Sequence, residues 1–325
     1  MKIQVLGGGA WGIALTRLLA LADHEVCLWV RNAARAAALH QTRQNETLLP
    51  GVLLPDSVSV SCESADDVEM AVYAVPSHAL REVATTLPFG NNVVRVSATK
   101  GIENETLLRM SEILGEITPA APVAVLSGPS HAEEVGRELP ACLVAAAADE
   151  AVRLQVQHVF GGPSFRVYTS HDVTGVELGG ALKNIIAIAA GACEGLGLGD
   201  NAKAALITRG LAEMIRLGVA CGAGAATFAG LSGLGDLVVT CASTHSRNYR
   251  VGRCIARDMT LDAILKSSPK VAEGIRTVKS ALQLARQHEI EMPIAESVYN
   301  VLYEDVNARD CITMLMTRLM RAEWE

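Results

Sequence analysis

The chain has 325 residues, a formal net charge of −7 and a sequence pI of about 5.7, so it lacks the basic excess that nucleic acids and anionic membranes attract. Half of the residues are hydrophobic but only 4% are aromatic, which predicts cores built from Ala, Val, Leu and Ile. The eight cysteines are scattered, with no C-x-x-C pair and no histidine spacing typical of zinc, so we expect reduced thiols and no bound metal.

The first predicted element is a short apolar strand, KIQVL at residues 2–6, which runs into the turn GGGAWG and a helical pattern over residues 14–22. Gly7, Gly9 and Gly12 form the Gly-x-Gly-x-x-Gly spacing that indicates dinucleotide binding when it follows a strand and opens a helix. In such a turn the first glycine permits the tight bend, the second lets the backbone approach a pyrophosphate, and the third lets helix and strand pack closely. An ordinary glycine turn is the alternative, but the position at the first strand–helix junction favours cofactor binding.

The second predicted strand, EVCLWV at residues 25–30, ends beside Arg31 and Asn32. NAD-preferring sites place an acidic residue here against the ribose 2′-hydroxyl, and this strand end has none. Arg31 is either a solvated loop residue or a contact for a 2′-phosphate or the adenine ring, and we favour the contact. We therefore expect NADPH or NADH as the cofactor, with a modest preference for NADPH.

The remaining predicted elements divide the chain into two halves. Further strands are predicted at residues 58–61, 70–75, 93–97, 123–126 and 142–146, with helices at 33–43, 78–86 and 105–114. Strands that alternate with helices predict an α/β fold with a parallel, doubly wound Rossmann-type sheet. Helical periods dominate afterwards, at residues 173–192, 201–221, 246–256, 261–265, 277–288 and 295–303. We expect a dinucleotide-binding domain at residues 1–172 and an all-helical substrate and catalytic domain at residues 173–325.

Two segments bear on the location of the protein. The N-terminal residues lead directly into the glycine turn, which is unlike a signal peptide. Residues 217–235 lack charge over nearly the length of a membrane span, but they are broken by glycines and small residues. We predict a cytoplasmic protein without membrane insertion.

Lys183 lies in an otherwise apolar helical pattern, ELGGALKNIIAIAAG at residues 177–191. Lysine is among the residues least often buried without a partner. One interpretation is an edge residue whose stem covers apolar surface while its ammonium reaches water. The other is a buried amine whose lowered pKa makes it a proton donor and acceptor. This segment by itself favours the edge residue.

Three more stretches carry polar residues at strand ends or helix starts. Lys100 in SATKGIENE follows a predicted strand, where open α/β sheets bind ligands. Gly128 and Ser130 in LSGPSHAEEV precede a helix, and a simple helix cap is the alternative. Residues 233–252 combine Asp236, Thr240, Ser246, Arg247 and Asn248. The run Ser246–Asn248 offers a hydroxyl, a guanidinium and an amide that suit either a phosphate or an ordinary helix start. Together with the dinucleotide turn, these stretches predict an active site.

Ten sequence motifs of this chain resemble those of the bacterial type of NAD(P)-dependent sn-glycerol-3-phosphate dehydrogenase. The matching motifs run nearly end to end, and they are GGGAWGIAL, LLPGV, AVPSH, SATKGIE, SGPSHAEEV, ELGGALKNIIAIAAG, NAKAALITRGLAEM, GLSGLGDLVVTC, SRNYRVG and VAEG. The resemblance implies reversible hydride transfer between NAD(P)H and C2 of dihydroxyacetone phosphate, giving sn-glycerol 3-phosphate for glycerophospholipid synthesis. It also implies a homodimer. One departure is Leu48, where the family often has an aromatic residue, and it leaves the contacts of that loop open.

The resemblance also implies a role for individual residues. Lys183 would be the catalytic acid and base, and Asp236 would orient its ammonium. The implied substrate-binding residues are Lys100, Gly128, Ser130, Lys183, Asp236, Ser246, Arg247 and Asn248. The implied cofactor-binding residues are Gly7, Gly9, Ala10, Trp11, Gly12, Arg31, Lys100, Ala132, Arg247, Val271 and Glu273. These roles reverse the interpretation of Lys183 as an edge residue.

Two other functions compete with this one. A ketopantoate or 3-hydroxyacid dehydrogenase would also combine a Rossmann half, a helical half and an interdomain lysine. The group Ser246–Asn248 argues against it, because a carboxylate substrate does not need a phosphate site. A non-catalytic NAD(P)-binding regulator is the second alternative, and the presence of Lys183, Lys100 and Asp236 together argues against it.

Overall fold

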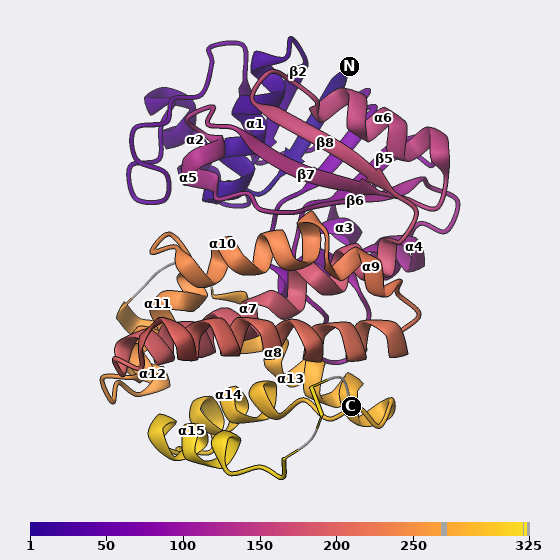
Figure 1. Cartoon of the computed structure of the whole chain (residues 1–325). Helices are drawn as coiled ribbons and strands as arrows, with labels where there is room; N and C mark the ends of the chain where they lie inside the picture. The colour runs from indigo at the N-terminus through magenta and orange to yellow at the C-terminus, as the bar shows by residue number, and fades with distance from the viewer. Residues whose placement is uncertain (268–271, 321, 324–325) are drawn as a thin grey trace.

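The computed structural model describes residues 1–267, 272–320 and 322–323 and has a sheet-containing half and a helical half (Figure 1). The first half is built on one sheet in the order β3-β2-β1-β4-β5-β6-β7-β8. The strands are β1 (Lys2–Leu6), β2 (Glu25–Trp29), β3 (Ser59–Ser61), β4 (Met70–Tyr73), β5 (Val94–Ser97), β6 (Val123–Ser127), β7 (Ala141–Ala146) and β8 (Phe165–Ser170). The first six strands have the 3-2-1-4-5-6 order of a doubly wound dinucleotide-binding sheet, which confirms the predicted fold class.

The prediction of a parallel sheet is wrong for one pair of strands. β6 and β7 are antiparallel, whereas the other neighbouring pairs are parallel. Their connection contains only the one-turn helix α5 (Ala132–Val135), which is too short to cross the sheet and return to the end where a parallel strand would begin. β8 escapes the sequence analysis because it is an edge strand in which only Phe165 and Val167 are buried.

Helices cover both faces of the sheet. α1 (Ala10–Leu21) and α6 (Glu150–Phe160) pack on one face, and α3 (Leu80–Thr86) and α4 (Met110–Ile117) pack on the other. Successive side chains of a strand point to opposite faces, so Val72 joins the first cluster and Tyr73 the second. The helix α2 (Ala33–Thr42) and the 3-10 turn η1 (Ser77–Ala79) complete this half.

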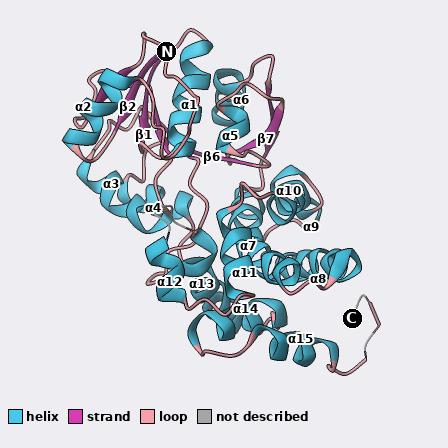
Figure 2. Cartoon of the chain, turned by 90° about the vertical axis from the view of Figure 1, so that its left-hand side faces the viewer, coloured by secondary structure: helices cyan, strands magenta, loops and turns pink. Residues whose placement is uncertain are grey.

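The helical half is built around one buried helix, α7 (Val173–Gly195). In both views this half lies below the sheet-containing half (Figure 1 and Figure 2). The other helices are α8 (Gly199–Ala220), α9 (Ala225–Phe228), the π-helical turn η2 (Leu231–Gly235), α10 (Asp236–Ala242), α11 (Arg247–Ile255), α12 (Leu261–Ser267), α13 (Glu273–Gln287), α14 (Pro293–Tyr303) and α15 (Ala308–Met316). By length and composition alone, α7 and the segment Ala225–Ala242 could cross a membrane. However, α7 is the core of this half, and the second segment is divided among α9, η2 and α10.

Two glycines bring α7 and α11 into backbone contact. A Cβ atom on Gly252 would overlap the carbonyl oxygen of Ile188, and one on Gly191 would overlap that of Tyr249. Because neither position has a side chain, the first two turns of α11 lie against residues 188–192 in the C-terminal part of α7. This contact brings Asn248 to Asn184, the residue next to Lys183.

We expect Gly252→Ala to destabilise the protein by about 1–3 kcal/mol, because overpacking against backbone cannot be relieved by a rotamer change. Urea unfolding followed by circular dichroism measures this loss. Gly115→Ala in α4 is the matched control, since nothing lies within 4 Å of the added Cβ and alanine favours a helix by about 0.5–1 kcal/mol. Equal unfolding midpoints for the two variants would contradict the close packing of α7 and α11.

Buried polar contacts connect the two halves. The Glu177 carboxylate on α7 accepts hydrogen bonds from Arg109 Nη1 at 2.6 Å and from Ser111 N at 2.8 Å, at the start of α4. On α13, Glu273 accepts a bond from Ser77 Oγ at 2.6 Å, and Ser280 Oγ donates to the carbonyl of Ile102 at 3.2 Å. The segments that follow β4 and β5 are therefore held against the helical half.

Candidate active site

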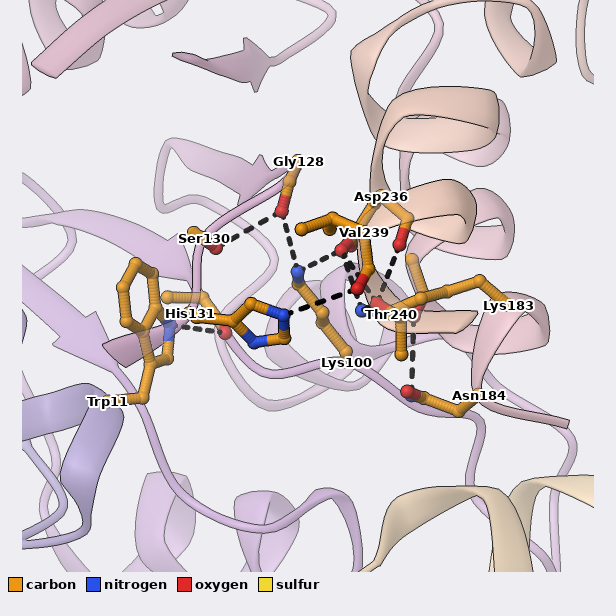
Figure 3. A network of polar contacts seen from close by, with 12 residues as sticks. Trp11, Lys100, Gly128, Ser130, His131, Lys183, Asn184, Asp236, Val239 and Thr240 are labelled. Carbon is orange, nitrogen blue, oxygen red and sulfur yellow. Dashed lines mark hydrogen bonds and ion pairs between the residues drawn. The ribbon is translucent and has the colours of Figure 1, made fainter. Parts of the chain in front are cut away.

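Two lysines share one buried carboxylate between the two halves (Figure 3). Lys183 Nζ lies 2.6 Å from Asp236 Oδ1, and Lys100 Nζ lies 2.6 Å from Asp236 Oδ2. Lys183 is only 6% exposed and Asp236 only 1%, so the amine is inside the protein and is not the edge residue that the local pattern favours. Lys100 follows β5 in the first half, whereas Lys183 and Asp236 belong to α7 and α10.

The π-helical turn η2 places Asp236 opposite Lys183. Such wide turns are rare and are frequent at functional sites. The turn lies close against α7, since a Cβ on Gly179 would come within 2.6 Å of the carbonyl oxygen of Ser232. Gly179 precedes Lys183 by four residues on the same face of α7, so this close approach brings the carboxylate to the amine.

The electrostatics of the cluster bring the pKa of Lys183 toward neutral pH. Burial lowers the pKa of Lys183 to about 8. The Asp236 carboxylate offsets part of this lowering, and the neighbouring Lys100 adds a smaller lowering. Burial alone would raise the pKa of Asp236, but the two ammonium groups outweigh it and hold this pKa below its usual value. With both lysines protonated, the cluster carries one excess positive charge, which suits an anionic ligand.

Thr240 belongs to this cluster, although it is absent from the site residues that the resemblance implies. Lys183 Nζ donates to Thr240 Oγ1 at 2.6 Å, and that hydroxyl donates to the backbone carbonyl of Asp236 at 2.6 Å. The i, i+4 spacing of Asp236 and Thr240 on one helix face was the available signal. Since its own proton is engaged, the Thr240 oxygen is free to accept from the lysine.

The loop after β6 closes the cluster from the side of the sheet. The carbonyl of Gly128 accepts hydrogen bonds from Lys100 Nζ at 2.9 Å and from Ser130 Oγ at 3.1 Å. Gly128 has a φ of 143°, which L side chains rarely adopt, and a Cβ there would come within 3.0 Å of Leu143. His131 follows, with its ring 3.5 Å from the carbonyl of Val239 on α10. The structure therefore brings Lys100, Gly128 and Ser130 together with Lys183 and Asp236.

Ser246, Arg247 and Asn248 at the start of α11 differ in their hydrogen bonds. Ser246 caps this helix by accepting a bond from Tyr249 N at 3.2 Å. Asn248 bridges two other helices, because its side chain donates to Asn184 Oδ1 at 2.8 Å and accepts from Gly274 N at 2.9 Å. The Arg247 side chain reaches the surface, but burial of its guanidinium lowers its pKa, and this group has no hydrogen bond or ion pair to any residue that the structure describes. It is the group of the three that is free to grip an anion.

The glycine turn after β1 fits a dinucleotide. Gly7 has a φ of 126°, and a Cβ there would lie 2.5 Å from the carbonyl oxygen of Ala74. A Cβ on Gly12 would overlap the carbonyl of Gly7, so α1 lies directly on the turn. Gly9 caps α1 without any side-chain hydrogen bond, and nothing lies within 4 Å of its missing Cβ. Free N–H groups at a helix start beside open space are what a pyrophosphate requires.

The other predicted cofactor-binding residues lie on several different elements. Ala10 begins α1, and Trp11 Nε1 donates to the carbonyl of Ala98 at 3.1 Å, so this ring lies between β5 and the glycine turn. Ala132 begins α5, which packs against α1. The Glu273 carboxylate accepts a hydrogen bond from Ser77 Oγ. Val271 lies outside the described residues.

Arg31 is exposed at the end of β2, as predicted, but a carboxylate lies beside it. Arg31 Nη1 is 3.8 Å from Glu82 Oε2 of α3, and the two side chains are 72% and 66% exposed. Residues adjacent to Arg31 in the sequence gave no signal for Glu82, because α3 brings this carboxylate there from another part of the chain.

A doubly wound sheet with a glycine turn at its first strand, facing a buried lysine of low pKa, defines a nicotinamide-dinucleotide-dependent oxidoreductase. Comparisons with known proteins narrow this class. The family model described as NAD-dependent glycerol-3-phosphate dehydrogenase N-terminus matches residues 2–153, and the one described as its C-terminus matches residues 172–313. The chain therefore belongs to the NAD-dependent glycerol-3-phosphate dehydrogenase family, and the resemblance seen in the motifs is confirmed.

Individual relatives agree with this assignment. The glycerol-3-phosphate dehydrogenase (NAD(P)+) of Moorella thermoacetica is 51% identical over 322 residues, which cover 98% of this chain and 96% of the relative. That of Pelotomaculum thermopropionicum is 48% identical over 332 residues, covering 100% and 95%. The crystal structure of glycerol-3-phosphate dehydrogenase from Coxiella burnetii has a TM-score of 0.93 at 35% identity and covers 98% of this chain and 99% of that chain. A ketopantoate reductase from Ralstonia eutropha, at 16% identity and a TM-score of 0.61, shares the fold alone.

Proposed function

We propose that this chain reduces dihydroxyacetone phosphate to sn-glycerol 3-phosphate with NADPH or NADH, in a reversible reaction. The observation that carries the proposal is the buried Lys183 amine, held by Asp236 beside Lys100 and facing the half that carries the glycine turn. Family membership and relatives named glycerol-3-phosphate dehydrogenase (NAD(P)+) support the same reaction.

Lys183 is the residue that donates or accepts the proton in this reaction. When bound, the nicotinamide cofactor supplies the hydride for C2 of the ketone. Lys183 Nζ, as ammonium, donates the proton that the C2 oxygen requires, so that ketone, hydride and proton together give the secondary alcohol. In the reverse direction the neutral amine accepts the hydroxyl proton. Asp236 and Thr240 hold the amine in place, and Lys100 adds positive charge beside the developing oxyanion.

The phosphate of the substrate is assigned to the start of α11. Arg247 has an uncommitted guanidinium, and it stands at the N-terminus of a nine-residue helix, where an anion is favoured. Ser246 and Asn248 lie on either side, with Ser130 and Gly128 completing the substrate site. Because the chain is acidic as a whole, this local charge must provide the attraction.

The proposal extends to the organisation of the protein. Residues 1–172 would hold the cofactor through the glycine turn, Ala10, Trp11, Arg31 and Ala132. Glu273 would contact the cofactor from the helical half, and Lys100 and Arg247 would reach both ligands. Residues 173–325 would hold the substrate. We further propose that the enzyme works as a cytoplasmic homodimer that supplies glycerophospholipid synthesis, as the resemblance implies.

The decisive experiment measures the oxidation of NADPH and NADH with purified protein. We expect oxidation that depends on dihydroxyacetone phosphate, together with formation of sn-glycerol 3-phosphate. Turnover of ketopantoate or of a 3-oxoacid in its place would identify one of the competing dehydrogenases. Cofactor binding without turnover of any of these substrates would instead indicate the non-catalytic regulator.

We expect Arg247→Ala to lower kcat/KM for dihydroxyacetone phosphate by a factor that corresponds to about 2–4 kcal/mol, because a charge-assisted pair is lost. Unphosphorylated dihydroxyacetone should be a poor substrate for the wild type and about equally poor for the variant. Arg250→Ala, on the same helix and bonded to His245 O at 3.5 Å, is the matched control. If the variant still discriminates against dihydroxyacetone as strongly as the wild type, the phosphate is held elsewhere.

A further inference from the structure

The pair of Arg31 and Glu82 bridges the strand that carries the glycine turn. In the sheet β1 lies between β2 and β4. Arg31 follows β2, and Glu82 belongs to α3, which follows β4 and η1. Since all three strands are parallel, their carboxyl ends lie at one edge, and the ion pair of 3.8 Å spans the end of β1.

The pair is also adjacent to the turn itself. A Cβ on Gly8 would lie 2.8 Å from Val30 Cγ2, so the glycine turn contacts the residue directly before Arg31. A dinucleotide bound at this turn extends its adenosine ribose toward the end of the second strand. The 2′ position of that ribose therefore comes to the region occupied by the pair.

The charges of this region come from both halves. Burial and the cations Arg276 and Arg31 lower the pKa of His78 in η1, whereas Glu273 and Glu82 oppose this lowering. In addition, Glu273 is bonded to Ser77, the neighbour of His78. Glu82 is thus a negative charge within a mixed cluster beside the cofactor site, rather than an isolated surface carboxylate.

We propose that Glu82 is a specificity-determining residue that weakens the preference of this enzyme for NADPH over NADH. A 2′-phosphate must displace the Glu82 carboxylate from the Arg31 guanidinium, and the displaced carboxylate then repels the phosphate. A 2′-hydroxyl makes no such demand, so NADH binding is indifferent to the pair. The inference rests on the proposed function only in taking NADPH and NADH as ligands of the glycine turn.

The test compares equilibrium binding, because exposed ion pairs have small effects that turnover could obscure. Kd values for NADP+ and NAD+ are measured by calorimetry at low salt for the wild type, Glu82→Gln and Glu150→Gln. Glu150 is the matched control, since it forms an exposed pair with Arg153 at 3.6 Å on the remote helix α6. We expect Glu82→Gln to raise the selectivity for NADP+ over NAD+ by about two- to fivefold, less at high salt, and Glu150→Gln to leave it unchanged.

A third variant tests whether Glu82 acts through Arg31. In the background of Arg31→Ala, we expect Glu82→Gln to change selectivity less than it does in the wild type, because the competition for the guanidinium is gone. Unchanged selectivity in Glu82→Gln, or an equal change with and without Arg31, would overturn the proposal. These binding results are independent of the turnover of dihydroxyacetone phosphate, so failure of the inference and failure of the proposed function are distinguishable.

Discussion

Lys183→Ala is expected to lower the turnover of dihydroxyacetone phosphate by at least about 10²–10⁴-fold, which is the usual contribution of one proton-transferring group. Lys183 Nζ is the buried amine whose pKa is lowered to about 8, so its loss removes the proposed proton donor to the C2 oxygen. The fold should persist, because Lys100 still neutralises Asp236 in the variant. Steady-state kinetics and thermal unfolding measure the two effects separately.

Cofactor affinity is the internal control for this variant. Lys183 lies in the helical half, away from the glycine turn, so the Kd for NADP+ should stay close to that of the wild type. Near-normal turnover by a folded variant would show that Lys183 is a structural residue. Loss of cofactor binding together with turnover would show that the substitution disturbs the contact between the two halves.

Asp236→Asn is expected to lower kcat/KM by a factor that corresponds to about 3–5 kcal/mol, because it leaves the buried Lys183 ammonium and the half-buried Lys100 ammonium without their carboxylate. Asparagine keeps the size of the side chain but not its charge, so the effect reports electrostatics. The pKa of Lys183 should fall below that of the wild type, since a carboxylate that raises it is lost while Lys100 remains.

The pH profile shows whether Asp236 acts through Lys183. Ketone reduction needs the ammonium form, so kcat/KM of the wild type should fall as the pH rises through about 8. Oxidation of sn-glycerol 3-phosphate needs the neutral amine and should rise through the same pH. In Asp236→Asn both transitions should move to lower pH. A variant with reduced activity but an unshifted profile would assign Asp236 a purely structural role.

Features that depend on residues adjacent in the sequence could be predicted from the local sequence pattern. The glycine turn requires three glycines within six positions between a strand and a helix, and all of these features are adjacent in the sequence. Seven of the eight strands could be located from local sequence in the same way, because most buried strands of a doubly wound sheet are continuous apolar runs. Lys183 was conspicuous for a related reason, since its cation interrupts an apolar helix.

Only the tertiary structure decided which residues that are distant in the sequence pair with one another. Asp236 lies 53 residues from Lys183 and 136 from Lys100, and no local periodicity indicates that the two lysines share its carboxylate. The same holds for the antiparallel pairing of β6 with β7 and for Glu82 beside Arg31, both of which depend on how the chain crosses the sheet. Residue type and spacing thus determined the fold class and the chemical groups of this protein. The close packing of helices and strands decided which groups meet, because the pKa of Lys183 depends on its burial and on the charges beside it.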